Sequence, residues 1–546
     1  MKQVFYILIV FLLAACYDDK GNYDYEEINT ITVLLDDVYS YRLDGDTTVC
    51  IIPELSQSLQ KNRDNLEFMW VHSVINEFIE GHDDNDTISR IDTLRFHIVP
   101  DDPDLEYEHY FRLNVYDKLT EINYPFNVKI KLVKPYDGAW MILHNENGHA
   151  ALGAVEYMGN SILKTQDAYY KETGKRLEGM AQCLGNYITY YYPYGRGEMF
   201  NLFSVITDKP EESGVMCQWK KFELMSPLTK MVYSSDQSRF NYSNVKLIDG
   251  EASWGAVCLS DGVLFQSPAA MKLYKANIAA DLGDNIRIKY ASKAGFGAIL
   301  YDEAGHRFCF YQNQSRSTTG DPNRFNPTDE NPSSYRINPV PKRDNNVTDV
   351  DVNNLPVEQK VLWVGAGYEF DPNNSRGFYA NSVSIKGLDS CFVYEFNMDG
   401  MVSTVDGHPA FAGYYKLKLP EGMDENSCFA STMSYSGILF YTVGNVVYRL
   451  DFKQAGGKAT AIYTHAGGKA VKMKFAKRYL SSSNAFDTYE FDVQYSLGIG
   501  FDMGNGKGDF VILNLSPTGS VGGDSEHYPA KQVYTDFGEI TDFVFI

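Results

Sequence analysis

Residues 438–450 read ILFYTVGNVVYRL, two apolar runs joined by the pair Gly444-Asn445. Runs rich in β-branched and aromatic residues on both sides of such a pair are a short-range signal for a β-hairpin. The same succession of apolar run, glycine-containing turn and apolar run recurs at 254–265, 296–311 and 497–513. The sequence therefore predicts an all-β protein in which the hairpin is the repeating unit.

Hairpins repeated over residues 135–546, with few helical patterns among them, predict a β-propeller of six to seven blades. The alternative is a string of further β-sandwiches. The last seven residues, ITDFVFI, are apolar to the end of the chain. Because an exposed strand of this kind would invite aggregation, we expect it to dock in a sheet beside the strand that begins at Trp140. One short helix is expected at 267–274, where Ser267 precedes a proline.

Residues 28–134 have a different pattern, with six β-branched and aromatic runs separated by turn-rich connections. Residues 111–115 and 126–132 alternate apolar and polar side chains, which is typical of strands on a half-buried sheet. We expect a separate sandwich of immunoglobulin type here, with Trp70 in its core.

The chain begins with Lys2, an apolar segment from Val4 to Leu13, and then Ala14-Ala15-Cys16. A charged start, a short apolar core and small residues are typical of a secretory signal, and this core is too short to span a bilayer. Small residues directly before a cysteine resemble a bacterial lipobox. That resemblance implies that residues 1–15 are a signal peptide, and that Cys16 is acylated and heads an acidic tether over 16–27.

The opening CYDDKGNYDY at 16–25 resembles that of the PKD-like lipoproteins of Bacteroidota. Residues 110–132 are similar to the last two strands of a PKD domain. The sequence differs from the family pattern after Trp70, where Val71-His72-Ser73 stands in place of an Asp-Phe-Gly-Asp-Gly turn. The resemblance implies a lipid-anchored protein on the outer face of the outer membrane, beside SusC/SusD-type nutrient-uptake proteins. A lipoprotein that faces the periplasm is the alternative.

Composition limits the partners of this chain. Its 71 acidic and 49 basic residues give a net charge of −22, which argues against nucleic acid and against anionic membrane surfaces as partners. The cysteines other than Cys16 form no CxxC pair, and we expect them to be buried free thiols. No cofactor or metal site is expected. The acidic loop at 80–86 lacks the spacing of an EF-hand, so a structural calcium ion there has no support from the sequence.

No catalytic residue is assigned. The Gly-x-Ser-x-Gly, Walker and HExxH motifs are absent from the sequence. Because His144 and His149 flank a predicted turn, we expect both to be solvated. The acids Asp302 and Glu303 share a hairpin tip, where such residues usually serve solubility.

Aromatic side chains give the best indication of a ligand. Tyr190, Tyr191, Tyr192 and Tyr194 crowd into residues 186–197, and tyrosine offers a flat apolar face with a hydroxyl group. Trp363 and Tyr368, around Gly365-Ala366-Gly367, are a second set of the same kind. A strand with tyrosine on both faces is the alternative reading of the first set.

These observations lead to three classes of function. We interpret the chain first as a noncatalytic component that binds a glycan, a peptide or a partner protein in nutrient uptake. The second class is a propeller-type hydrolase or lyase that acts on extracellular polysaccharide. The third is a structural surface component. Inward-facing carboxylates in the propeller centre would favour the enzyme, and an aromatic platform would favour binding.

Overall fold

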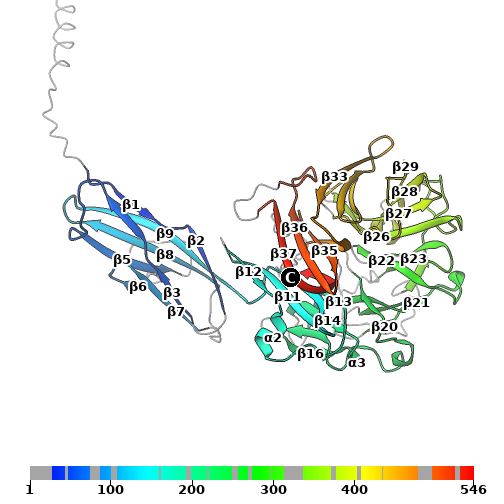
Figure 1. Cartoon of the computed structure of the whole chain (residues 1–546), viewed down its shortest axis with the longest axis horizontal. Coiled ribbons are helices and arrows are strands. Elements are labelled where there is room, and N and C mark those ends of the chain that lie inside the picture. The colour runs from blue at the N-terminus through cyan, green and yellow to red at the C-terminus, as the bar shows by residue number, and fades with distance from the viewer. Residues whose placement is uncertain are drawn as a thin grey trace, which may run out of the picture. The chain divides into compact units, whose positions relative to one another are not determined.

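The computed structural model describes residues 28–43, 47–73, 86–99, 107–158, 161–191, 198–217, 221–248, 256–267, 273–294, 297–312, 336–370, 377–402, 408–432, 434–476, 495–522 and 529–546. The predicted signal peptide, Cys16 and the tether to residue 27 lie outside these residues, as does most of the acidic loop at 80–86. The chain divides into two compact units, Met1–Val133 and Lys134–Ile546, named unit 1 and unit 2. Strands dominate both units (Figure 1), which confirms the all-β prediction.

Unit 1 packs two layers of strands on one core. Its strands are β1 (Ile31–Leu34), β2 (Val38–Arg42), β3 (Thr47–Ile51), β4 (Glu54–Gln57), β5 (Leu66–Ser73), β6 (Asp86–Ser89), β7 (Leu94–Ile98), β8 (Glu108–Asp117) and β9 (Ile122–Val133). One layer is the five-stranded sheet β2-β9-β8-β5-β6, and the pairs β1-β4 and β3-β7 form the other. Both layers contribute to one hydrophobic cluster. Trp70 is fully buried in it, as predicted, and its Nε1 donates to the carbonyl of Asp92 at 3.0 Å.

Unit 2 contains sheets that follow one another along the chain, numbered 1 to 7 here. Sheet 1 holds β10 (Ala139–Glu146), β11 (His149–Met158) and β12 (Ser161–Thr165); sheet 2 holds β13 (Ala181–Tyr191), β14 (Glu198–Thr207), β15 (Gly214–Cys217) and β16 (Glu223–Pro227). Sheet 3 holds β17 (Val245–Leu247), β18 (Ala256–Ser260), β19 (Val263–Ser267) and β20 (Tyr274–Lys275). Sheet 4 holds β21 (Asn277–Ile278), β22 (Ile288–Ala294), β23 (Gly297–Asp302), β24 (Arg307–Gln312) and β25 (Arg336–Pro339).

The remaining sheets complete the series. Sheet 5 holds β26 (Gln359–Phe370), β27 (Gly377–Lys386), β28 (Ser390–Asn397) and β29 (Phe411–Lys418). Sheet 6 holds β30 (Phe429–Ala430), β31 (Ile438–Val443), β32 (Val446–Asp451) and β33 (Lys458–Thr464). Sheet 7 holds β34 (Lys469–Phe475), β35 (Ser496–Gly504) and β36 (Lys507–Asn514), and the long β37 (Lys531–Phe545) joins it to sheet 1. The short helices are α2 (Ala168–Thr173), α3 (Leu228–Met231), α4 (Met398–Val402), η2 (Gln237–Arg239) and η3 (Ala280–Leu282).

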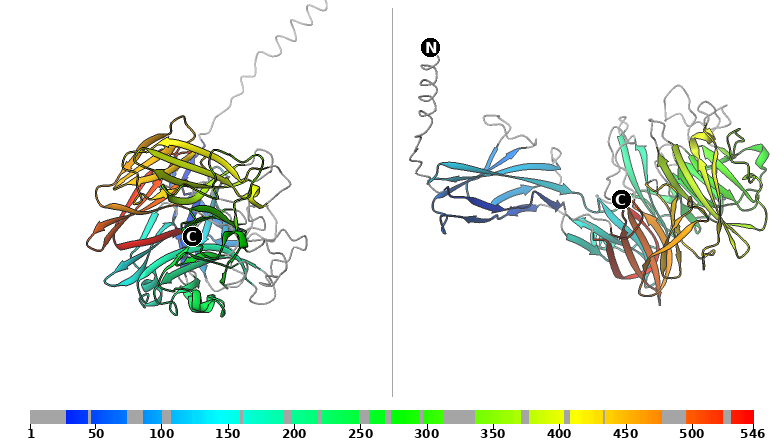
Figure 2. Two further views of the ribbon diagram at one scale, coloured as in Figure 1. Left: turned by 90° about the vertical axis from the view of Figure 1, so that its right-hand side faces the viewer. Right: turned by 90° about the horizontal axis from the view of Figure 1, so that it is seen from above.

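The core of unit 2 is divided among the interfaces of consecutive sheets. Leu143 and Phe203 belong to the cluster between sheets 1 and 2, and Trp140 and Phe510 to the cluster between sheets 7 and 1. Five further clusters occupy the interfaces from sheet 2 to sheet 7. Each sheet is therefore buried on both faces by its two neighbours, and the sheets fan around a common centre (Figure 2). A string of sandwiches would give each sheet a single partner, so the packing contradicts that alternative.

The final strand closes this series. The first half of β37 pairs antiparallel with β36, and its second half pairs with β10, where Phe545 lies opposite Trp140. The prediction that the apolar C-terminus docks beside the strand at Trp140 is thus confirmed. Trp140 packs edge-on against Phe510, Phe543 and Phe545 with ring centroids 5.5–5.8 Å apart.

The helix predicted at 267–274 falls mostly on residues 268–272, which lie outside the described residues; its two end residues, Ser267 and Tyr274, lie in β19 and β20. We expected the cysteines to be buried, which is wrong for two of them. Cys50 is exposed because it faces outward on β3, and Cys428 is only half-buried. The other described cysteines are buried, and all of those described are free thiols.

Candidate ligand-binding site

A cavity of about 610 Å³ opens where the innermost strands of unit 2 meet. Residues of β13, β17, β22, β26, β30, β34 and β37 line it, so the strand nearest the centre in each sheet contributes. Its volume falls within the range of small-molecule sites, about 300–1,000 Å³. The seven-sheet arrangement itself creates this site, since no single sheet could form the wall.

The carboxylate of Asp542 ties three sheets together beside the cavity. Its Oδ1 lies 2.8 Å from Nζ of both Lys472 and Lys474 on β34, and its Oδ2 accepts a hydrogen bond from the backbone N–H of Leu184 at 3.0 Å. The side chain of Asp542 is only 1% exposed. Burial opposes its ionisation, but the two ammonium groups outweigh burial and hold the pKa of Asp542 below its usual range. Asp542 is therefore a buried carboxylate that the two lysines stabilise in its charged form, and it links sheets 7, 1 and 2.

Aromatic rings form another part of the wall. Trp363 on β26 is half-buried, and its ring lies 6.0 Å from that of Phe429, stacked at 27°. A Cβ atom at Gly365 would fall 1.7 Å from Cζ2 of Trp363, so only glycine leaves room for the indole to lie against its own strand. The absence of a side chain at Gly365 thus leaves space for the indole along the cavity wall.

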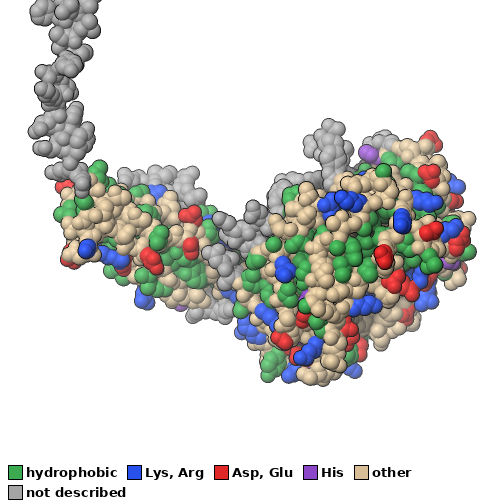
Figure 3. All heavy atoms as spheres, turned by 45° about the horizontal axis from the view of Figure 1, so that its top comes forward, with side chains coloured by type: hydrophobic (Ala, Val, Ile, Leu, Met, Phe, Trp, Pro, Cys, Tyr) green, Lys and Arg blue, Asp and Glu red, His purple; other side chains and the backbone are tan. Residues whose placement is uncertain are grey.

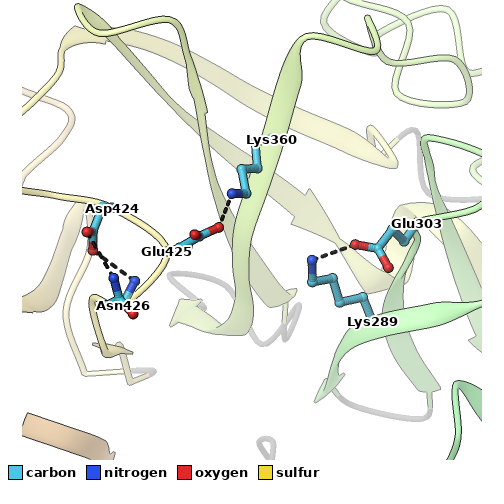
Figure 4. A network of polar contacts seen from close by, with 6 residues as sticks. All are labelled: Lys289, Glu303, Lys360, Asp424, Glu425 and Asn426. Atoms are coloured by element: carbon cyan, nitrogen blue, oxygen red, sulfur yellow. Dashed lines mark hydrogen bonds and ion pairs between the residues drawn. The ribbon is translucent and has the colours of Figure 1, made fainter.

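Basic side chains outnumber acidic ones among the described residues that line the cavity. Lys246, Lys289, Lys472 and Lys474 are the basic residues, and Glu425 and Asp542 the acidic ones. Figure 4 shows how two of these residues are held: Lys289 contacts Glu303, and Glu425 contacts Lys360. The hydrogen bond from Lys289 to Glu303 raises the pKa of that lysine. Both lining carboxylates are therefore engaged by lysine.

Neither the lysines of the cavity nor Asp542 were predicted as site residues, although the sequence contains a signal for them. Residues 471–475 read VKMKF, so Lys472 and Lys474 alternate with apolar residues and project from one face of the strand. Asp542 is the one acid in the apolar ending ITDFVFI. A lone acid in an apolar strand needs a buried partner, and two lysines on one face of another strand can supply it.

Of the six aromatic residues predicted to bind a ligand, the structure describes the side chain of Trp363 alone. Trp363 lines the cavity wall. Tyr190 and Tyr191 end β13, and Tyr368 lies near the end of β26, so both sets sit on innermost strands; for these three the structure describes the strand position alone. Tyr192 and Tyr194 lie outside the described residues, as does Cys16.

The expectation that His144 is solvated was wrong. Its side chain is fully buried in β10 because this strand is covered on both faces. Nε2 donates to the carbonyl of Gln166 at 3.1 Å, and Nδ1 accepts from the N–H of Gly538 at 3.0 Å. Asp302, placed at an exposed hairpin tip by the sequence, is also buried, and it accepts a hydrogen bond from Nε of Arg307 at 2.9 Å. Both residues have structural partners.

Other kinds of site find no support among the described residues. No group of three or more histidine, cysteine, aspartate or glutamate side chains is placed there to hold a metal ion. Within the same residues, no helix is long and apolar enough to cross a membrane. Acidic and basic side chains are interspersed over the face drawn in Figure 3.

Comparison with known proteins supports the resemblance of the N-terminal part of the chain to the PKD-like family. Residues 16–180 match the model of the PKD-like family, so the match extends beyond unit 1 through sheet 1. Among curated proteins, none matches this sequence.

Several solved structures are similar to this chain in part and share little sequence with it. One is a quinonprotein alcohol dehydrogenase-like protein from Bacteroides thetaiotaomicron, at 10% identity and a TM-score of 0.37, covering 93% of this chain and 96% of that one. AztD from Citrobacter koseri has 9% identity and a TM-score of 0.34, covering 88% and 98%. YCF48 bound to D1 peptide has 7% identity and a TM-score of 0.28, covering 67% and 90%.

Proposed function

We propose that this chain is a lipoprotein of the outer membrane, acylated at Cys16 and exposed at the cell surface, that binds a glycan or peptide without transforming it. In this proposal it serves a nutrient-uptake system of the SusC/SusD type. The match of residues 16–180 to the PKD-like family supports the setting, and the cavity of unit 2 supports the binding role.

The architecture that carries this function is, in our proposal, an immunoglobulin/PKD-like sandwich followed by a seven-bladed β-propeller. The two-layer core around Trp70 supports the sandwich. For the propeller, the support is the series of cores between consecutive sheets and the closing pairing of β37 with β10. Propellers bind ligands where their innermost strands converge, and the cavity lies there.

The observation that carries the binding role is the Trp363–Phe429 wall inside this cavity. An aromatic face in a cleft of this size offers a large apolar contact at little entropic cost. Neutral hydrogen-bonding side chains from several sheets surround it, among them Asn186, Ser292 and Thr541. An apolar face with polar groups converging on it is the usual composition of a ligand site.

The enzyme alternative is less well supported. A glycoside hydrolase needs a pair of carboxyl groups, one of them kept protonated to act as an acid. Of the two carboxylates among the described lining residues, Glu425 contacts Lys360, and lysines hold the pKa of Asp542 below its usual range. A purely structural component would have no use for the cavity.

Removing the indole tests the binding role. The full chain, purified in nonionic detergent, is run in native gels that contain soluble polysaccharides or peptides, next to Trp363→Ala. We expect a ligand that retards the wild type and a weakening of about tenfold in the variant, or about 1.4 kcal/mol. Tyr170→Ala, which removes an exposed ring on α2, is the matched control. Equal retardation of Trp363→Ala and wild type by every retained ligand would remove the cavity from the proposal.

A further inference from the structure

We propose that the cavity selects a saccharide that carries carboxylate groups, a uronate, with its carboxylate at Lys472 and a sugar ring on Trp363. This inference rests on the proposed function and names the class of its ligand. It follows from the charge of the cavity, from the position of Lys472 and from the aromatic wall.

The charge of the cavity is opposite to that of the protein. The chain carries a net charge of −22, yet twice as many lysines as acids line the cavity among its described residues. A concave site bordered by protein of low dielectric constant concentrates the field of such groups. An anion is therefore attracted to this cavity, although the protein as a whole repels anions.

Lys472 is a partly exposed lysine of the cavity that shares its carboxylate partner with a second lysine. Its side chain is 35% exposed, whereas that of Lys474 is 13% exposed and that of Asp542 is 1% exposed. Asp542 is part of the wall but almost completely buried, and its Oδ1 also accepts a hydrogen bond from the N–H of Phe543 at 2.9 Å. Two ammonium groups therefore share one carboxylate, and Lys472 is the more exposed of the two. A ligand carboxylate beside Lys472 would balance this charge at a partly desolvated position, where an ion pair gains more than at the surface.

The aromatic wall favours a sugar over an acidic peptide. A pyranose ring has a flat apolar face and a rim of hydroxyl groups. The apolar face can stack on the indole of Trp363. The hydroxyl groups can form hydrogen bonds with hydroxyl side chains of the wall such as Ser292, Ser427 and Thr541. β30, which carries Phe429, lies between the strands of Trp363 and Lys472 in the order of the sheets. A uronate unites the ring and the carboxylate in one residue of the polymer.

Calorimetric titration of the full chain in nonionic detergent tests the inference. The probes are oligogalacturonate, oligomannuronate and glucuronate-containing oligosaccharides, fully methyl-esterified oligogalacturonate, and polyglutamate as the acidic peptide. At least one uronate is expected to bind. Esterification and the substitution Lys472→Met are each expected to weaken that binding at least tenfold, and so is a rise from 50 to 500 mM NaCl.

Two variants on β34 serve as controls, and one on β17 is a substitute for Lys472→Met. Lys469→Met removes an exposed charge outside the cavity on β34 and is expected to bind within twofold of the wild type. Lys472→Arg keeps the charge and is expected to bind uronate more tightly than Lys472→Met. Should Lys472→Met fail to fold, Lys246→Met removes a lining charge from an exposed side chain on β17 and is expected to weaken uronate binding in the same direction.

The inference is overturned if no uronate binds, if the ester binds as well as the acid, if Lys472→Met binds like the wild type, or if polyglutamate binds more tightly than every uronate. These results differ from a failure of the proposed function. A neutral glycan that binds the wild type and is lost in Trp363→Ala would leave cavity binding intact and remove only the preference for anions.

Discussion

Phe545 lies directly opposite Trp140 in the antiparallel pairing of β37 with β10, so the last residues of the chain complete the first sheet of unit 2. The same strand completes sheet 7 through its pairing with β36. One strand thus closes the series of sheets and also places Asp542 beside the cavity. The closing of the series of sheets and the position of Asp542 therefore both depend on residues 540–546.

Deletion of residues 540–546 tests closure. The deletion removes the innermost strand of sheet 1 and the partner of Lys472 and Lys474, so unit 2 should become insoluble or lose most of its thermal stability. Calorimetric melting of the full chain is the measurement, with unit 1 expected to keep its own transition. Deletion of the same number of residues from the tether, 21–27, is the control. A chain shortened at its C-terminus that melts like the wild type would contradict the closed ring.

Asp542→Asn tests the buried anchor. The substitution leaves two partly buried ammonium groups without their carboxylate, which should cost about 3–5 kcal/mol of unfolding free energy. Glu539→Gln, an exposed acid on the same strand, should change it by less than about 0.5 kcal/mol. Denaturant unfolding measures both. Similar values for the two variants would show that the anchor contributes nothing.

His144 predicts a dependence of stability on pH. Burial lowers the pKa of its imidazole, and the acceptor role of Nδ1 toward Gly538 requires the neutral ring. In the unfolded chain the imidazole of His144 takes up a proton near pH 6.5, whereas in the folded chain it stays neutral to a lower pH. The contribution of His144 is therefore complete above about pH 6.5 and is lost as the pH falls below it, at up to about 1.4 kcal/mol per pH unit.

His144→Asn isolates this contribution, because an amide oxygen can take the hydrogen bond from Gly538 without titrating. The unfolding free energy of the variant should fall less steeply than that of the wild type between pH 6.5 and pH 5. His149→Asn, at a half-buried position on β11, serves for comparison. Parallel curves for His144→Asn and wild type would show that folding leaves the pKa of His144 unchanged.

Cys16→Ser tests the proposed anchor. Acylation needs the thiol, so the variant should appear in the soluble fraction of cells while the wild type fractionates with the outer membrane. Cys50→Ser, which removes an exposed thiol in unit 1, should leave the distribution unchanged. Retention of the Cys16→Ser protein in carbonate-washed membranes would contradict the lipoprotein assignment.

Local patterns predicted the hairpins well because their signals lie within a few residues. Residues 438–450 form β31 and β32, and Gly444 between them takes the left-handed backbone, with φ at 58°, that the Gly-Asn turn requires. The closing strand was predictable for a similar reason, since an apolar chain end needs a partner. The expected number of blades followed from length alone and stayed a range.

Burial and pairing between distant residues were not predictable in the same way. His144 was misplaced because a polar residue next to a turn usually faces solvent, whereas here both faces of β10 are covered. Residues 340–355 pack on sheets 4 and 5 through Val340, Val352 and Leu355, although the sequence there shows no periodicity that would reveal this packing. The cavity escaped prediction because its wall draws one strand from each sheet, and only the closed arrangement brings them together.

A crystal structure of the full chain with its bound saccharide would locate the ligand. We expect it in the cavity of unit 2, with a sugar ring stacked on Trp363 and a carboxylate within hydrogen-bond distance, about 3 Å, of Nζ of Lys472. An ordered ligand on another surface of the protein, with the cavity holding only water, would contradict this expectation.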